Sequence, residues 1–319
     1  MLLVQKFGGS SLADAERLRH VAELCRKARA GTELVVVVSA MGDTTDSLTA
    51  QARSITHEPP ARELDAFVTT GEQQAAALLV MSMEALGLPA VSLTGWQAGI
   101  LTDARWGDGE ILAVDPRRIR RELSRGCVPV VTGFQGVCPA GDVTSLGRGG
   151  SDTTAVALAA ALEADGCEIF TDVDGIYTAD PRLLPEARRL TAIDTRDMLA
   201  LSRAGSKVLH PKSVELALAG NVPLRLLSSF ALGDGTEVML LPESGRPRLA
   251  GLTGRPGSGR ITLAGKGADA AALSEAALLL SKAGVAVKDG ALGENSLTLT
   301  VAPEEQKDAM RIIHNGMIL

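Results

Sequence analysis

Hydrophobic and polar residues alternate in two patterns over the first three quarters of the chain. One pattern is a short continuous apolar run, such as Leu34–Ser39, and the other is a longer stretch with apolar residues at helical spacing, such as Ala13–Ala30. Strands without polar alternation are buried on both faces, which is typical of a parallel sheet covered by helices. We therefore predict an α/β fold, a three-layer αβα sandwich around a mostly parallel central sheet. The other apolar runs are Leu2–Val4, Ala90–Leu93, Val128–Thr132, Cys167–Thr171, Pro223–Leu227 and Thr236–Leu241, and the other helical stretches are Glu72–Leu86, Pro116–Arg125, Asp152–Ala164, Thr195–Ala204 and Pro211–Ala219.

The pattern changes near Leu241. Residues 241–259 are rich in Gly, Pro and Arg, as in a linker or in strands that cross between domains. The elements predicted after this segment have the order βαββαβ, which is a ferredoxin-like pattern. We therefore expect one domain over residues 1–245 and a small second domain over residues 246–319. Its predicted elements are strand Arg260–Ala264, helix Ala270–Lys282, strand Val285–Asp289, strand Ser296–Val301, helix Pro303–His314 and a short apolar end at Met317–Leu319.

Composition restricts the classes of partner. A length of 319 residues suggests about two domains, and a net charge of -6 argues against nucleic acid as a partner. Every apolar run is shorter than the roughly 18 residues of a membrane span, and no signal-type leader is present, so we expect a cytoplasmic protein without membrane contact. Neither paired C-x-x-C cysteines nor an H-E-x-x-H motif occurs. We therefore expect reduced thiols and no metal site held by the protein.

The segment KFGGSS, residues 6–11, directly follows the first apolar run. Gly8 and Gly9 let backbone N–H groups approach an anion closely, Lys6 neutralises charge, and Ser10 precedes a predicted helix. This combination suits a phosphate group. A plain strand-to-helix turn explains the segment about equally well when it is taken alone.

The segment SLGRGGSDTTA, residues 145–155, has three glycines within four residues before an alanine-rich helix. We expect the side chain of Ser151 or Asp152 to cap that helix. A cap does not require the glycines, whereas a loop that folds over a phosphate or a small anionic substrate does. Arg148 between the glycines offers a planar fork that suits a carboxylate.

The segment FTDVDGIYTADPR, residues 170–182, leaves a buried strand at its carboxyl end, where open α/β sheets bind ligands. Thr171 and Asp172 lie at that strand end. The Asp-Gly and Asp-Pro pairs are turn signals that shape the loop. Within the loop, Tyr177 can pack on a base and Arg182 can reach phosphates.

Three further segments are weaker signals. SAMGDTTDSL, residues 39–48, supplies Ser39 and Thr45 after the most apolar strand, and TTGEQ places Glu72 at the start of a helix, where a carboxylate also favours the helix dipole. Taken alone, each is more often a helix-entry turn than a site. Lys207 in GSKVLHPKS is, taken alone, an ordinary solvated lysine.

Several common signatures are absent from the sequence. It contains no G-x-x-x-x-G-K-[ST] loop, no H-R-D or D-F-G pair of a protein kinase and no G-x-S-x-G elbow. Asp152 occupies the position of the last glycine in a G-x-G-x-x-G motif, which argues against a Rossmann dehydrogenase.

Taken together, KFGGSS, SAMGDTTD, TTGEQ, GFQG (133–136), SLGRGGSDTTA, FTDVDGIYTADPR and GSKVLHP follow the order found in the aspartokinases. Over residues 1 to about 230 the chain resembles this group of the amino-acid kinase superfamily. The resemblance implies the amino-acid kinase fold and ATP-dependent phosphorylation of the side-chain carboxylate of L-aspartate to 4-phospho-L-aspartate, with Mg²⁺. This reaction is the first step toward lysine, threonine and methionine or toward a specialised aspartate-derived product.

The resemblance also implies roles for individual residues. Lys6 would stabilise the transferring phosphoryl group and Asp152 would organise that lysine. Glu72 would pair with the substrate ammonium and Arg148 with its α-carboxylate. The residues implied for nucleotide binding are Lys6, Gly8, Gly9, Ser10, Thr171, Asp172, Tyr177, Arg182 and Lys207, and those implied for aspartate are Ser39, Thr45, Glu72, Arg148, Gly150 and Ser151.

The region after residue 245 departs from the family pattern. Aspartokinases of this type usually carry two ACT domains in tandem, which bind lysine or threonine, whereas about sixty residues here suffice for one ACT-like unit. We therefore expect weak or absent feedback inhibition and a homodimer. Two alternatives remain open, a kinase for another carboxylate substrate and a non-catalytic regulatory subunit.

Overall fold

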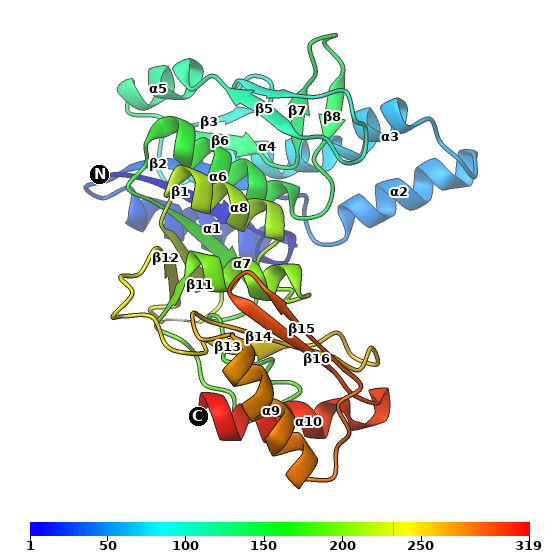
Figure 1. Cartoon of the computed structure of the whole chain (residues 1–319). Coiled ribbons are helices and arrows are strands. Elements are labelled where there is room, and N and C mark those ends of the chain that lie inside the picture. The colour runs from blue at the N-terminus through cyan, green and yellow to red at the C-terminus, as the bar shows by residue number, and fades with distance from the viewer. Residues whose placement is uncertain (232) are drawn as a thin grey trace. The chain divides into compact units, whose positions relative to one another are not determined.

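The computed structural model describes residues 1–231 and 233–319, and the chain divides into two compact units. The first unit comprises Met1–Asp174 and Ala219–Gly233, and the second comprises Gly175–Leu218 and Asp234–Leu319. Figure 1 labels helices and strands from both units. Each unit therefore contains two separate stretches of the chain, and the predicted domain boundary near residue 245 stays a prediction.

A parallel sheet forms the centre of the first unit. Its strand order is β11-β9-β1-β2-β6-β3, and each neighbouring pair is parallel. The continuous apolar runs predicted these strands because both faces of the sheet are covered, so that no polar alternation is needed. The strands are β1 (Leu2–Phe7), β2 (Glu33–Val38), β3 (Ala90–Leu93), β6 (Val128–Thr132), β9 (Gly166–Thr171) and β11 (Leu224–Ser228).

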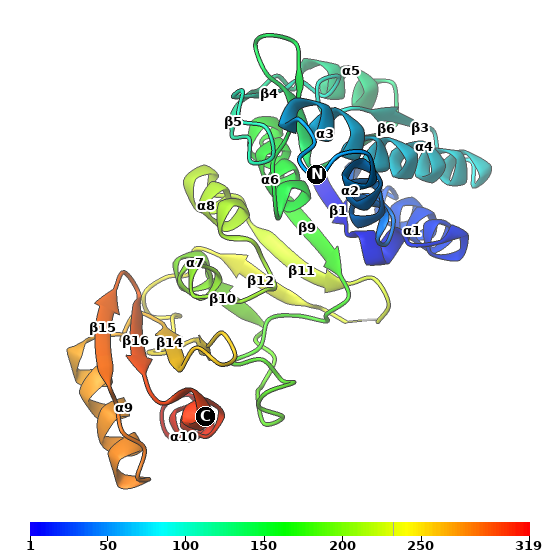
Figure 2. The same cartoon turned by 90° about the vertical axis from the view of Figure 1, so that its right-hand side faces the viewer.

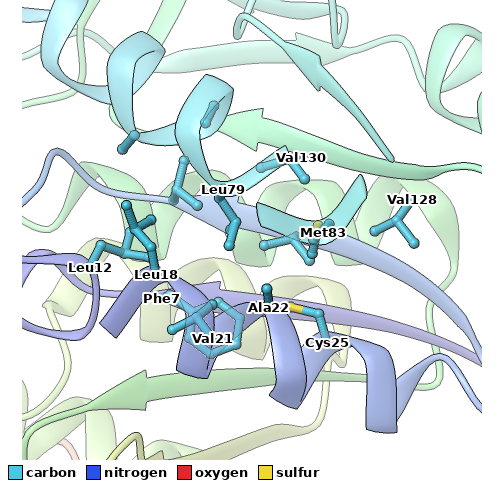
Figure 3. Close-up of a cluster of buried hydrophobic side chains, with 14 of the residues drawn as sticks. Phe7, Leu12, Leu18, Val21, Ala22, Cys25, Leu79, Met83, Val128 and Val130 are labelled. Carbon is cyan, nitrogen blue, oxygen red and sulfur yellow. The ribbon is translucent and has the colours of Figure 1, made fainter. Parts of the chain in front are cut away.

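Helices cover both faces of this sheet. Helices α1 (Ala15–Ala28) and α4 (Thr70–Ala85) pack on one face, where Val21 of α1 and Leu79 of α4 lie in a buried cluster (Figure 3). Helix α6 (Gly150–Leu162) contacts β1, β2 and β9, and Figure 2 shows it on the side of the sheet opposite α1. The predicted αβα layering is thus confirmed.

A small second sheet and three shorter helices complete the first unit. The order of this sheet is β5-β4-β7-β8, built from β4 (Ile100–Thr102), β5 (Ile111–Val114), β7 (Gln135–Val137) and β8 (Val143–Ser145). The sequence patterns did not predict it, because β5 is partly exposed and β7 and β8 contain polar residues, so these strands form no continuous buried apolar run. The helices are α2 (Thr44–Ile55), α3 (Ala61–Val68) and α5 (Arg117–Ser124), and a 3₁₀ turn, η1 (Gly9–Leu12), follows β1.

The second unit contains a short parallel pair and an antiparallel sheet. Strands β10 (Ala192–Asp194) and β12 (Thr236–Met239) are parallel, and α7 (Thr195–Arg203) and most of α8 (Pro211–Gly220) accompany them. The antiparallel sheet has the order β13-β14-β16-β15. Its elements are β13 (Gly251–Thr253), β14 (Arg260–Ala264), α9 (Ala270–Lys282), β15 (Asp289–Gly293), β16 (Ser296–Thr300), η2 (Pro303–Glu305), α10 (Gln306–Ile313) and the closing π-helical turn η3 (His314–Ile318).

This sheet fits an ACT-like domain, but its fourth strand is not the predicted one. The end of the chain, expected as a strand at Met317–Leu319, belongs to the helical turn η3, and β13 from the supposed linker pairs with β14 instead. The strand expected at Val285–Asp289 begins at Asp289, and all of β15 is exposed. An exposed strand has no apolar alternation, so its position could not be identified from the sequence pattern.

The loop after residue 174 packs into the core of the antiparallel sheet. Ala179 and Leu184 of that loop are buried with Leu252 and Ile261 of the sheet and with Ile313 of α10. Leu252 N also donates a hydrogen bond of 2.8 Å to Thr178 O. The loop and the sheet therefore share one hydrophobic core.

The structure also describes the cysteines and the lengths of the apolar helices. All four cysteines are free, and Cys25, Cys138 and Cys167 are buried. Over the described ranges, we find no helix long and apolar enough to cross a bilayer.

Candidate active site

Lys6 and Asp152 form a buried ion pair at the carboxyl end of β1. Side chains alternate along a strand, so Lys6 lies on the opposite face from Phe7, which packs in the cluster with α1 and α4. Lys6 therefore faces α6, and its Nζ lies 2.7 Å from Asp152 Oδ1 in the first turn of that helix. The two side chains are 11% and 15% exposed. The pair holds a cation at a fixed place beside the glycine loop.

The glycine pair after Lys6 allows close approach of three loops. Gly8 N donates to Phe170 O at 3.3 Å, and Gly9 O accepts a hydrogen bond of 2.9 Å from Gly42 N. A Cβ atom on Gly9 would lie 2.7 Å from Ala40 O, so only glycine fits there. The loops after β1, β2 and β9 thus meet at one edge of the sheet, as the ligand site of an open α/β sheet requires.

The turn η1 is anchored from α1 and from the loop after β11. Arg17 of α1 donates to Ser10 O at 2.5 Å and stacks over the ring of Phe230 at 5.0 Å. The hydroxyls of Ser11 and Ser229 are 2.6 Å apart and buried. The side chain of Ser10 stays exposed, so it is free to meet a ligand.

Helix α6 begins earlier than predicted, and its cap is different. It starts at Gly150, and its N-cap is Gly149 (φ 71°), which provides no side-chain hydrogen bond. The prediction that the side chain of Ser151 or Asp152 caps the helix is therefore wrong. Gly147 (φ 69°) and Gly149 both need the left-handed conformation that glycine adopts without strain, which explains two of the three glycines. Asp152 does not cap the helix, and its carboxylate pairs with Lys6 instead.

The loop GFQG lies against the start of α6. A Cβ atom on Gly133 would be 2.7 Å from Ser151 Cβ, and one on Gly150 would be 2.9 Å from the Phe134 ring. This close packing brings the end of β6 to Ser151. Arg148 is exposed at the tip of the neighbouring loop and has no ion-pair partner among the described residues.

Glu72 is a buried carboxyl in the first turn of α4. It is 3% exposed, and its Oε1 accepts a hydrogen bond of 3.1 Å from Ala40 N in the loop after β2. Its Oε2 is buried without a hydrogen-bonding partner in the described parts of the chain. Burial raises the pKa of Glu72 to about 7. Ser39 adjoins Ala40, and the half-buried Thr45 follows in the first turn of α2, so these three expected residues surround one loop.

The residues expected around the nucleotide belong to both units. Thr171 Oγ1 donates to Asp172 Oδ1 at 3.0 Å in the first unit. In the second unit, the backbones of Tyr177 and Arg189 form an isolated antiparallel β-bridge. The exposed Arg182 forms an ion pair of 2.8 Å with Asp180, and Lys207 is also exposed. Their joint role in a nucleotide site stays a prediction.

Comparison with known proteins identifies the family. The pattern of the amino acid kinase family matches residues 1–228. The chain belongs to the amino acid kinase family. It is 51% identical over 267 residues to an aspartate kinase of Pseudomonas putida, covering 83% of this chain and 65% of that protein. It is 54% identical over 237 residues to an aspartokinase of Corynebacterium glutamicum, covering 74% of this chain and 56% of that protein. The chain thus spans less than two thirds of the length of these curated relatives.

Solved structures agree with this assignment to the amino acid kinase family. An aspartate kinase from Synechocystis superposes with a TM-score of 0.69 at 32% identity, covering 99% of this chain and 69% of that one. E. coli aspartokinase III in complex with aspartate and ADP superposes with a TM-score of 0.72 at 26% identity, covering 95% of this chain and 79% of that one. The resemblance to aspartokinases is therefore confirmed.

The sequence analysis of this amino acid kinase missed two buried polar residues that shape the site. Asp65 of α3 accepts hydrogen bonds from Ser145 N (2.7 Å), Ser145 Oγ (2.8 Å) and Gly107 N (2.9 Å), and so holds β8 before the glycine loop. Gln135 Nε2 donates to Thr69 O at 2.9 Å, where α4 begins. Asp65 gave no signal because α3 was not predicted, whereas Gln135 lies within GFQG.

Proposed function

We propose that this member of the amino acid kinase family transfers the γ-phosphoryl group of ATP to the side-chain carboxylate of L-aspartate. The observation that carries the proposal is the buried Lys6–Asp152 pair, 2.7 Å long, beside the loop of Gly8 and Gly9. Aspartokinase relatives at about half identity support the substrate, as does the neighbour from E. coli whose structure holds aspartate and ADP.

Phosphoryl transfer depends on positioning and on charge neutralisation. A side-chain carboxylate oxygen of aspartate bonds to the γ-phosphorus as the bond from that phosphorus to the β–γ bridging oxygen breaks, and ADP leaves with the electron pair. The product is 4-phospho-L-aspartate. Lys6 supplies positive charge to the phosphoryl oxygens, and Asp152 fixes its ammonium group. No strong general base is needed because a carboxylate is already a nucleophile at neutral pH.

The aspartate pocket is proposed between the loops after β2 and β6 and the start of α6. Glu72 would bind the substrate ammonium and Arg148 the α-carboxylate, with Ser39, Thr45, Gly150 and Ser151 around them. A positive ammonium next to Glu72 stabilises its ionised form, so aspartate binding would lower the pKa of this carboxyl and release a proton.

Nucleotide binding is proposed for Gly8, Gly9 and Ser10 and for Thr171, Asp172, Tyr177, Arg182 and Lys207. The described residues contain no group of three His, Cys, Asp or Glu side chains arranged to hold a metal. This fits Mg²⁺, which is usually bound by one or two carboxylates and substrate phosphates and would thus come with ATP.

A cytoplasmic homodimer is the proposed working state of the protein. Light scattering on the purified protein tests whether it is a dimer.

The experiment is an ADP-release assay with ATP, Mg²⁺ and aspartate, combined with hydroxylamine trapping of the acyl phosphate. We expect ADP release that depends on aspartate, with formation of the aspartyl hydroxamate. Glutamate in place of aspartate tests the other carboxylate substrate and should give little hydroxamate. Folded protein that releases no ADP in response to aspartate would overturn the proposal and favour a non-catalytic subunit.

A further inference from the structure

Thr132 ends strand β6 on the face that packs against α4. Side chains two residues apart share a face of a strand, so Thr132 follows Val128 and Val130, which lie in the core with Leu79 and Met83 of α4 (Figure 3). Glu72 lies near the beginning of α4, about one helical turn before the buried Ala75 and Ala76 and on the same face of the helix. Thr132 and Glu72 therefore occupy corresponding ends of the same packed layer.

Both residues present a buried oxygen atom that lacks a partner. Thr132 is 1% exposed, and its Oγ1 has no hydrogen-bonding partner within the described residues. The same holds for Glu72 Oε2, although Glu72 Oε1 accepts from Ala40 N. Burying a polar atom without a partner destabilises the folded state, whereas valine would fill the position of Thr132 at no such cost. The buried hydroxyl of Thr132 therefore points to a hydrogen-bonding partner outside the protein.

Neighbouring contacts hold these two oxygens in place. The Gln135 side chain donates to Thr69 O and fixes the first turn of α4, which carries Glu72. Gly133 N, next to Thr132, donates to Val38 O at 2.9 Å, and Val38 is the partner of Thr132 in the sheet register. Gly133 also packs on Ser151, so the end of β6 adjoins the proposed aspartate pocket. The acceptors are preorganised for a ligand in that pocket.

We propose that Thr132 Oγ1 and Glu72 Oε2 together receive the α-ammonium group of the substrate, so that Thr132 is a further substrate-binding residue. The inference rests on the proposed function and deepens it. An ammonium group has three donors and no acceptor, so it matches two acceptor oxygens, one of which is ionised. A phosphate or carboxylate at the same place would be repelled by Glu72. The pair therefore selects an amino acid over a diacid that lacks the amine.

The test is steady-state kinetics of Thr132→Val and Thr132→Ser with aspartate and with succinate, which lacks the amine. We expect Thr132→Val to raise KM for aspartate about tenfold or more and to leave KM for ATP unchanged. The preference for aspartate over succinate should fall by a similar factor, because a buried acceptor discriminates only while it is present. Thr132→Ser keeps the hydroxyl and should retain nearly the wild-type KM.

Thermal unfolding separates this role from a structural one. Thr132→Val removes an unpartnered hydroxyl, so its Tm without aspartate should equal or exceed that of the wild type. The matched control is Thr102→Val, whose buried hydroxyl is hydrogen-bonded to Thr144 in the other sheet of the first unit. That variant should lower Tm and leave KM for aspartate unchanged.

Two results would overturn the inference. One is an unchanged KM for aspartate in Thr132→Val, and the other is a raised KM with a lower Tm, which would make the hydroxyl structural. Binding is also measured without turnover, as the rise in Tm that aspartate produces, and this rise should be smaller in Thr132→Val than in the wild type. Wild-type protein that binds aspartate without releasing ADP would overturn the proposed reaction, while the Tm shifts would still decide the role of Thr132.

Discussion

Lys6 and Asp152 form a direct ion pair, 2.7 Å from Nζ to Oδ1, although Lys6 lies near the end of a strand and Asp152 lies in the first turn of a helix almost half the chain away. Both side chains are largely withdrawn from water, and the desolvation of two charges offsets much of their attraction. Such a pair contributes little net stability compared with apolar residues of similar volume. Its place beside the glycine loop is better explained by the charge it holds ready for a ligand.

Replacing Lys6 by alanine should therefore abolish most of the turnover. We expect kcat to fall about a thousandfold or more, because a fixed cation acts on charge that develops in the transition state. The measurement is aspartate-dependent ADP release, with Lys27→Ala on the exposed side of α1 as the control that keeps full activity.

Near-normal turnover in Lys6→Ala would remove Lys6 from the phosphoryl site. Because the variant leaves Asp152 buried without its cation, its unfolding must be followed alongside activity. The double variant Lys6→Ala/Asp152→Asn removes that unpaired charge, so it should regain stability and remain inactive.

Glu72 should make both stability and aspartate binding depend on pH. Burial raises its pKa from 4.5 to about 7, so between these values the folded state binds more protons than the unfolded state. Stability contributed by this group is therefore present below pH 4.5 and is lost as the pH rises toward 7. The loss amounts to about 3 kcal/mol in the free energy of unfolding. Urea unfolding of wild type and Glu72→Gln across this range should show a difference that grows with pH.

The binding of aspartate should respond in the opposite direction. An ionised carboxylate pairs with the substrate ammonium, so KM for aspartate should rise as the pH falls below 7. In Glu72→Gln the KM should be high and nearly independent of pH between 6 and 8. A wild-type pH dependence that persists in this variant would assign it to another group.

Gly133 should tolerate no side chain, because the start of α6 lies against it. A Cβ atom there would meet Ser151 Cβ at 2.7 Å and Ser151 Oγ at 2.8 Å. Gly133→Ala should lower the free energy of unfolding by about 1 to 3 kcal/mol and raise KM for aspartate by displacing Ser151. The control is Gly166→Ala in β9, where the nearest atom lies at 3.6 Å. Equal behaviour of the two variants would contradict the packing argument.

Arg246 should be indispensable for the stability of the second unit. Its side chain is 3% exposed and contacts Asp197 at 2.5 Å and Asp194 at 3.7 Å, and both carboxylates are fully buried. Arg246→Met would leave them without that cation and should cost about 3 to 5 kcal/mol in urea unfolding. Burial raises the pKa of Asp197, so Asp197→Asn in the same variant should recover part of the loss. No recovery in the double variant would contradict this assignment.

The sequence predicted those parts of the fold in which burial is nearly complete. Strand β2 contains five consecutive buried residues, Leu34–Val38, and such a short apolar run rich in valine favours a buried strand. Helix α2 has no buried residue, and β15 is exposed throughout, so neither gives a periodic signal. The type of an element can be predicted where burial requires apolar residues at regular positions. It cannot be predicted where the element is exposed, because many polar sequences are then compatible with it.

The sequence predicts individual segments of the site but not how they are arranged in space. KFGGSS and SLGRGGSDTTA are recognisable only as separate segments, and the predicted cap on α6 is wrong because Gly149, and not Ser151 or Asp152, is the N-cap of the helix. In the sequence, Thr132 marks only the end of an apolar strand. Thr132 places a hydroxyl at the last position of a fully buried strand. This hydroxyl becomes informative only once the structure shows that it has no hydrogen-bonding partner among the described residues.

The shared core of the second unit limits how the protein can be trimmed. Ala179 and Leu184 are buried among side chains that come mainly from residues 249–313, while Tyr177 and Arg182 lie in the same loop. A chain cut at residue 245 would lose the packing partners of this loop and expose its apolar side chains to water. The small antiparallel sheet thus serves as the scaffold of the loop that carries Tyr177 and Arg182, two residues proposed to bind the nucleotide.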